Sequence, residues 1–303
     1  MPEIPEKLVS YILLGLLSGL GIFGTRVVWS RFFRRFGESE PGVGLLIAVA
    51  FLIGETMVHG TTLRAWVAIL LLAGAGLIPV SEKKTVLRLF LIAFGGVLLA
   101  SWTITDKPLW LRASIVLGTV WLSSAFGGFD KRHAATNQTL LLLLVTMGGI
   151  LIIVPDTEET ALLFGALMAA TLLVFPFRLS ALGQTGTLPI AGLLAWIICI
   201  NGYGRPASIV TSTGCLGLLV AAPLVYFVTK NKLNQTHQVT APAGELIIHC
   251  ISIAIVLYLA RTTSNLRQAA VVAAVALGVS FVGLLVLVLL KWPWTESNRR
   301  HTV

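Results

Sequence analysis

Charge is scarce in this sequence. Only 12% of its 303 residues are charged, 56% are hydrophobic, and the mean hydropathy is +0.90. A soluble domain carries about 25% charged residues, because its surface must be hydrated. The scarcity of charge therefore excludes a soluble module, and we expect a single transmembrane domain over residues 1–303.

Strict alternation of polar and apolar residues is also missing from the long hydrophobic runs. Its absence excludes an outer-membrane barrel and favours helices, which satisfy their own backbone hydrogen bonds in lipid. Because a bilayer core of about 30 Å needs about 20 apolar residues per helix, we predict an all-α polytopic protein. The eleven predicted spans are residues 8–29, 42–58, 63–80, 86–104, 109–126, 139–154, 160–175, 187–201, 207–228, 244–261 and 268–291.

Cysteine is rare and unpatterned. Cys199, Cys215 and Cys250 all fall inside predicted spans, and no CxxC pair occurs. We therefore expect buried thiols, with neither a disulfide framework nor a metal site.

Basic residues are spread unevenly over the predicted loops. With the N-terminus outside, 15 of the 22 Lys and Arg residues fall in inner loops and 7 in outer ones. Cytoplasmic loops are enriched in Lys and Arg, so this predicts an N-out, C-in, multi-pass protein of the cell inner (cytoplasmic) membrane. The basic inner face has two explanations. The basic residues either only set the orientation of the protein during membrane insertion, or they also attract phosphate groups.

A short polar segment, Gly183–Thr187, interrupts the apolar pattern between two predicted spans. Residues 175–200 read FPFRLSALGQTGTLPIAGLLAWIICI, so Gly183–Thr187 leads directly into an apolar run. This segment resembles a signature of the polyprenyl-phosphate N-acetylhexosamine-1-phosphate transferases, membrane enzymes that move a sugar phosphate from a UDP-sugar onto a lipid carrier. That family usually has Gly-Asp-x-Gly-Ser here, and its Asp holds magnesium. In this chain Gln184 stands at the Asp position and Thr187 at the Ser position.

Other segments resemble the family in their order along the chain. Residues 74–88, GAGLIPVSEKKTVLR, have the flanks of a GxxDD segment, but Pro79 and Val80 replace the acid pair. Residues 123–135, SSAFGGFDKRHAA, resemble the motif that follows the fifth span, and Asp130 keeps its first Asp. After the ninth span, the family's His-x-His-His type motif is represented by a single histidine, His237.

The resemblance implies a set of site residues. Asp130 is the candidate catalytic residue. The candidate substrate-binding residues are Ser124, Gly127, Lys131, Arg132, Arg178, Gly183, Gln184, Thr185, Gly186, Thr187 and His237. The family requires magnesium, but one carboxylate is a poor magnesium site, so we expect no metal and no cofactor in this chain.

Simpler interpretations stay open for these residues. Asp130 also fits a helix cap or an ion pair with Lys131 or Arg132. The segment Gln184–Thr187 also fits a polar turn that leads into a helix, whereas as a helix N-terminus it would favour phosphate.

Two pairs of ionisable residues lie within predicted spans. Glu55 and His59 are four residues apart, as are Glu245 and His249, so each pair can share one helix face. Ionisable residues in a membrane are candidates for function, although both pairs lie close enough to the interfaces to be solvated.

Three functions follow as hypotheses, and whether the chain is an enzyme stays open. The first is a catalytically impaired relative of the transferases that binds a membrane lipid or polyprenyl phosphate as a regulatory or scaffold subunit of envelope polysaccharide assembly. The second is an active transferase that also binds a UDP-sugar. The third is a transporter or flippase of a lipid-linked substrate, using the Glu/His pairs. Other envelope-assembly membrane proteins are candidate partners, and nucleic acid is not.

Overall fold

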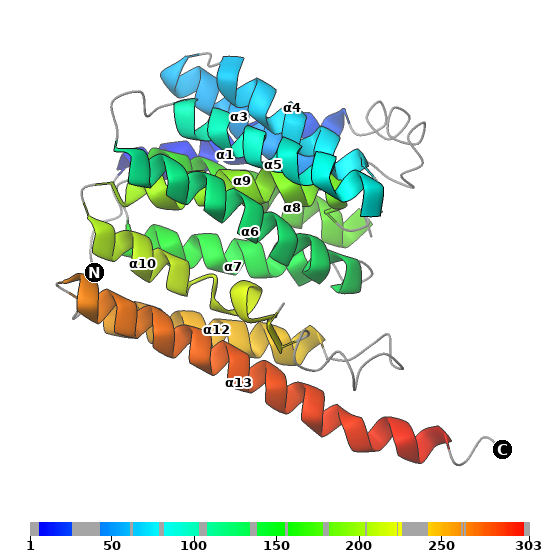
Figure 1. Ribbon diagram of the computed structural model, residues 1–303. Helices are drawn as coiled ribbons and strands as arrows, with labels where there is room; N and C mark the ends of the chain where they lie inside the picture. The colour runs from blue at the N-terminus through cyan, green and yellow to red at the C-terminus, as the bar shows by residue number, and fades with distance from the viewer. Residues whose placement is uncertain are drawn as a thin grey trace.

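Helices form at almost every apolar run of the sequence. The structure is a computed structural model (Figure 1). It describes residues 6–25, 43–60, 63–78, 82–102, 108–133, 138–154, 157–177, 182–203, 205–222, 224–225, 242–261, 263 and 265–299, without the side chains of 82–83, 127–133, 174–177, 184, 242–243 and 289–299. No strand occurs in these residues.

Eleven helices occur in the described residues, in chain order. They are α1 (Glu6–Gly24), α3 (Val43–His59), α4 (Leu63–Leu77), α5 (Glu82–Trp102), α6 (Leu109–His133), α7 (Gln138–Ile153), α8 (Glu158–Phe177), α9 (Gln184–Asn201), α10 (Pro206–Gly214), α12 (Pro242–Ala260) and α13 (Leu266–Arg299). Every predicted span except 207–228 coincides with one of these helices, and α6 and α13 extend beyond the predicted C-terminal boundaries.

The run 207–228, predicted as one span, is interrupted. α10 ends at Gly214, and a turn begins at Cys215. The Thr211 and Thr213 hydroxyls donate to backbone carbonyls four residues earlier, each at 2.8 Å. Such back-bonding weakens a helix, and glycine has a low helix propensity, so the local sequence favours ending the helix here.

Four described helical segments are long and apolar enough to cross a membrane: Glu6–Gly24, Lys84–Trp102, Leu109–Phe126 and Leu266–Val288. Shorter apolar helices of 10–17 residues accompany them. Large apolar side chains point outward from α1, α5 and α13, including Leu17, Phe90 and Val282. An outward apolar surface on helices of this length is that of an integral membrane protein.

Cys250 departs from the sequence-based expectation. Cys199 and Cys215 are buried as predicted, but Cys250 is exposed. It shares the outward face of α12 with Ile247 and Ile251, which are 58% and 49% exposed. The prediction of a buried thiol was wrong because a residue inside an apolar span can face lipid instead of protein.

The helices run back and forth between two ends of the bundle. The Glu158 end holds the last turn of α3 and the first turn of α8, because His59 contacts Glu158. The Gln184 end holds the first turns of α3 and α9, because Gly44 contacts Gly186. Consecutive helices alternate in direction along the bundle axis (Figure 1), as the hydrogen bond from Arg64 in α4 to the Ser101 carbonyl in α5 illustrates.

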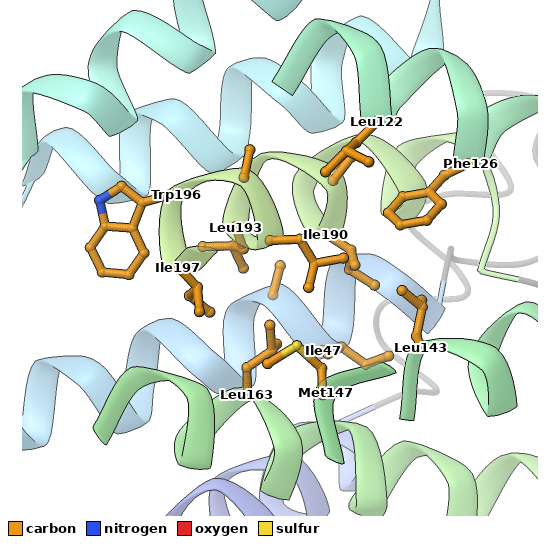
Figure 2. Close-up of a cluster of buried hydrophobic side chains, with 14 of the residues drawn as sticks. Ile47, Leu122, Phe126, Leu143, Met147, Leu163, Ile190, Leu193, Trp196 and Ile197 are labelled. Carbon is orange, nitrogen blue, oxygen red and sulfur yellow. The ribbon is translucent and has the colours of Figure 1, made fainter. Parts of the chain in front are cut away.

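α9 is the buried centre of the bundle. Every residue from Thr185 to Cys199 is buried. Figure 2 shows α9 surrounded by side chains from α3, α6, α7 and α8. The Trp196 ring stacks on Trp102 with centroids 4.2 Å apart and meets the edge of Phe51 at 6.3 Å. A helix apolar on all sides is stable only when other helices cover it, and the neighbours of α9 do so.

Close backbone contact anchors the N-terminal end of α9. A Cβ atom placed on Gly186 would lie 2.6 Å from the Gly44 Cα atom, so neither position accepts a side chain. In lipid, apolar contact gives helices little reason to associate. Small residues let the backbones approach closely, and the resulting van der Waals packing holds the helices together. This contact fixes the start of α9 against the start of α3.

We predict that Gly186→Ala destabilises the bundle. The added methyl group meets the α3 backbone, which must shift, so we expect the free energy of unfolding to fall by about 1–3 kcal/mol. The matched control is Gly74→Ala, because no atom lies within 4 Å of that Cβ position. Denaturation of both variants in detergent checks this, and equal stability would contradict the packing of α9 on α3.

Candidate functional site

Two of the motif segments lie at the same end of the bundle. α6 and α9 pack side by side in opposite directions, and a Cβ atom on Gly118 would lie 3.1 Å from the Ala195 Cβ atom. α6 runs on to His133 and α9 begins at Gln184. The last turns of α6 therefore lie at the Gln184 end, together with the first turn of α9.

The candidate residues of α6 occupy its C-terminal part. Gly127, Asp130, Lys131 and Arg132 are helical, and their side chains lie outside the described residues. Ser124 is exposed, and its hydroxyl donates to the Val120 carbonyl at 3.0 Å. The backbone thus places the acid and both basic residues at the Gln184 end.

The first turn of α9 is held by Gly183. This residue has a φ of +69°, a conformation that favours glycine. Its carbonyl accepts hydrogen bonds from the N–H groups of Gly186 at 3.1 Å and Thr187 at 2.9 Å. Thr185 and Thr187 are buried, at 0% and 1% exposure. The two hydroxyl-bearing side chains therefore serve the packing of α9, and a ligand role for them stays a prediction.

The remaining candidate positions lie outside what the structure describes. They are Arg178, His237, Pro79, Val80 and the side chain of Gln184. Their proposed roles stay predictions.

An acid–histidine cluster lies at the opposite end. His59 Nδ1 lies 3.0 Å from Glu55 Oε1, and His59 Nε2 lies 3.1 Å from Glu158 Oε2. The Glu55 side chain is almost completely buried, whereas His59 is 45% exposed. One imidazole thus joins α3 to α8, and the i,i+4 pair predicted from the sequence gains a partner from a distant helix.

The second predicted pair lies between α7 and α12. Glu245 and His249 are both 0% exposed. Gln138 Nε2 donates to Glu245 Oε2 at 3.4 Å. His249 Nε2 lies 2.8 Å from the Thr146 hydroxyl and 3.2 Å from the Leu142 carbonyl. The prediction that this pair is solvated was wrong for these two side chains, because α7 covers that face of α12.

Hydroxyl groups continue this polar face along α12. Ser280 of α13 donates to the Ser252 hydroxyl at 3.1 Å, and Ser252 donates to the Ala276 carbonyl at 3.1 Å. Gly217, just after the interruption that follows α10, lies against both serines, and a Cβ atom there would be 3.0 Å from Ser280 Oγ. Buried polar side chains in an apolar bundle are stabilised by bonding to one another, and Ser252 and Ser280 do so between α12 and α13.

A cavity opens near the Glu158 end of the same helices. Its volume is about 410 Å³, and α7, α10 and α12 enclose it. Ile153 and Leu257 form apolar walls, while Thr211 and Arg261 supply polar groups. This lining suits an amphiphilic molecule or water more than a purely apolar ligand.

The partners of both ionisable pairs were not predicted. Glu158, Gln138, Thr146 and Ser280 come from other helices, and the i,i+4 spacing says nothing about them. A partial signal exists for α7, where Gln138 and Thr139 begin an otherwise apolar run and Thr146 follows two turns later. Residues spaced by two turns lie on the same face of a helix, so this spacing predicts a polar stripe on α7.

Comparison with known proteins adds no relative. No protein-family model matches the sequence, and no curated protein matches it. The resemblance of residues 74–88, 123–135 and 175–200 to the transferase family therefore stays a prediction.

We predict that Glu55 depends on His59. In His59→Ala the buried carboxylate loses this partner, which we expect to lower the free energy of unfolding by about 1–3 kcal/mol. A neutral amide needs no counter-charge, so Glu55→Gln introduced together with His59→Ala should restore part of that loss. Thermal denaturation of the wild type, both single variants and the double variant forms the cycle. Strictly additive losses would mean that the two side chains do not act as a pair.

Proposed function

We propose that this chain is a multi-pass protein of the cell inner membrane that binds an isoprenoid lipid phosphate at its Gln184 end. The observation that carries the proposal is the antiparallel packing of α6 on α9, which supports a common site for the segments around Asp130 and Gly183. These are the two segments with the strongest resemblance to the polyprenyl-phosphate sugar-phosphate transferases.

The charge of the last turn of α6 favours a phosphate ligand. Lys131 and Arg132 lie in that turn, and the first turn of α9 lies at the same end. Basic side chains near a helix N-terminus suit phosphate, because charge-assisted hydrogen bonds add to the field of the free amides. Apolar burial of the isoprenoid tail against the outward helix faces supplies further affinity.

Catalysis is not part of this proposal. Transfer of a sugar phosphate needs the pyrophosphate charge to be neutralised, normally by magnesium held on carboxylates. Gln184, Pro79 and Val80 stand where the resembled family has acids, and Asp130 is the carboxylate that remains. The chain fits a binding, regulatory or scaffold subunit of envelope polysaccharide assembly better than an active transferase.

The proposal requires the Gln184 end to face the cytoplasm, with eleven spans and the N-terminus outside. The alternating helix directions support the odd number of crossings, and the basic inner loops support the orientation. In the predicted topology, Lys7, Arg64 and Arg205 are among the 7 of the 22 Lys and Arg residues on the outer side, the side of the Glu158 end.

Sided cysteine labelling tests this orientation. In a background without native cysteines, we expect an impermeant maleimide added outside cells to label Arg205→Cys, at the Glu158 end, and to spare Thr25→Cys, at the Gln184 end. Both positions are exposed in the structure, so burial does not limit either reaction. The reverse pattern would place the motif segments outside the cell and overturn the proposal.

Lipid retention tests the phosphate site. We expect Lys131→Ala and Arg132→Ala to weaken binding of a polyprenyl phosphate by about tenfold or more, as for loss of a charge-assisted hydrogen bond of about 1.5–3 kcal/mol. Binding of the neutral polyprenol should change little. Arg267→Ala, an exposed basic residue at the start of α13, is the matched control. Native mass spectrometry measures both lipids on each variant.

Two results, one from this experiment and one from a separate transferase assay, contradict the proposal in different ways. Equal retention of phosphate and alcohol by the wild-type protein would mean that the Gln184 end holds no phosphate site. Magnesium-dependent release of UMP from a UDP-N-acetylhexosamine, abolished by Asp130→Asn, would show that the chain is an active transferase.

A further inference from the structure

His249 lies deep within the helical part of the chain and away from the motif segments. It is the eighth residue of α12, so it stands about 10 Å along the helix axis from Pro242 at the Gln184 end. Its side chain is 0% exposed, whereas Ile247 and Ile251 on the opposite face are exposed. Burying an ionisable side chain in a membrane bundle costs free energy, so such a residue is a candidate for function.

Hydrogen bonds fix which ring nitrogen of His249 carries the proton. The Thr146 hydroxyl donates its proton to the Leu142 carbonyl at 2.8 Å, so its oxygen is left to accept. His249 Nε2 lies 2.8 Å from that oxygen and 3.2 Å from the same carbonyl, which can only accept. Nε2 is therefore the donor, and Nδ1 is left as an acceptor.

The acceptor nitrogen has no partner among the described residues. Nδ1 of His249 is buried and makes no hydrogen bond there. Buried polar atoms are nearly always paired, so an unpaired acceptor calls for an explanation. Its free lone pair is chemically a base, in a position that water does not reach in this conformation.

A polar route leads from the Gln184 end to His249. Glu245 lies one helical turn before His249 on the same face of α12, near the start of the helix. Gln138, the first residue of α7, bonds to the Glu245 carboxylate, and Thr139 is buried beside it with its hydroxyl oxygen unpaired among the described residues. The carboxylate thus stands between the end of the bundle and the imidazole.

The route is closed on the other side of His249. Beyond it, the hydroxyl protons of Ser252 and Ser280 are already donated. A Cβ atom on Gly149 would lie 3.0 Å from Ile253 and 3.4 Å from the Cys215 sulfur, so these groups form a tight apolar contact. The cavity at Thr211 and Arg261 lies on the far side, toward the Glu158 end.

We propose that His249 is a proton-binding site reached from the Gln184 end through Glu245. A hydronium ion at the Gln184 end gives its proton to the Glu245 carboxylate and is left as water. The proton then passes from Glu245 to the Nδ1 lone pair, so a new N–H bond forms at Nδ1 and the carboxylate is ionised again. The resulting imidazolium keeps its Nε2 hydrogen bonds, and the Glu245 carboxylate balances its charge. No electron transfer and no further reactant is required.

Within the part of the chain that the structure describes, Glu245 is the acidic side chain on the same face of α12 as His249. α7 presents Gln138, Thr139 and Thr146, and α13 presents Ser280, none of which titrates in the physiological range. The turn after α10 adds the thiol of Cys215, which lies near Ile253. Proton uptake at His249 therefore changes the net charge of a buried layer between α7, α12 and α13, and histidine protonation is a known trigger for changes in packing between elements.

This inference does not depend on the lipid-phosphate site. The two sites use different helices, since the motif segments belong to α6 and α9. A protein that binds no polyprenyl phosphate could still take up a proton at His249.

Nitrogen NMR of the full-length protein in lipid bilayers tests the proposal. The chain has five histidines, and the ¹⁵N signals of His249 are those missing from His249→Gln. At neutral pH we expect a protonated Nε2 and an unprotonated Nδ1. On acidification we expect Nδ1 to become protonated while the protein stays folded. In Glu245→Gln a smaller fraction of Nδ1 should be protonated at the same acidic pH, because the balancing charge is gone.

Further variants keep the test valid if His249→Gln fails to fold. Thr146→Val removes one acceptor of the Nε2 proton, so it should change the Nε2 signal, and Thr146→Ser should restore it. His59→Gln, at the Glu158 end, is the control that should leave the His249 signals unchanged. A protonated Nδ1 with a bare Nε2 at neutral pH would overturn the proposal. So would an Nδ1 that stays unprotonated down to the pH at which the protein unfolds.

Discussion

The burial of α9 is the constraint on which the arrangement of this protein depends. Helices in lipid gain little from apolar contact alone, so they associate where small residues allow close packing. The contact of Gly186 with Gly44 and the stacking of Trp196 on Trp102 fix the two halves of α9. The antiparallel packing of α6 on α9 then follows, and with it the meeting of the motif segments at the Gln184 end.

Polar side chains divide the bundle into regions with different chemistry. The Glu158 end carries a histidine held between two carboxylates, while the last turn of α6 brings basic residues to the Gln184 end. Between them, α7, α12 and α13 enclose Glu245, His249 and the Ser252–Ser280 pair. The histidine cluster and the layer around His249 each use residues from helices distant in sequence, so the fold assembles chemistry that no single span contains.

Local sequence predicted the helices and left their partners open. The apolar runs around α3, α4, α8 and α9 predicted those helices closely, because run length and hydropathy are local properties. The interruption after Gly214 was missed, since hydropathy ignores the hydroxyl and glycine content that weakens a helix. His59 with Glu158, and His249 with Thr146, could not be predicted, because such pairings depend on which helices pack together.

The most direct test of the central claim is to locate the bound lipid on the chain. A polyprenyl phosphate with a photoactivatable group next to the phosphate would be cross-linked in membranes and mapped by peptide mass spectrometry. The account predicts labelling concentrated in the last turns of α6 and around Gly183, with competition by unlabelled lipid phosphate but not by the alcohol. Labelling spread evenly over the outward faces of α1, α5 and α13, or equal competition by the alcohol, would contradict it.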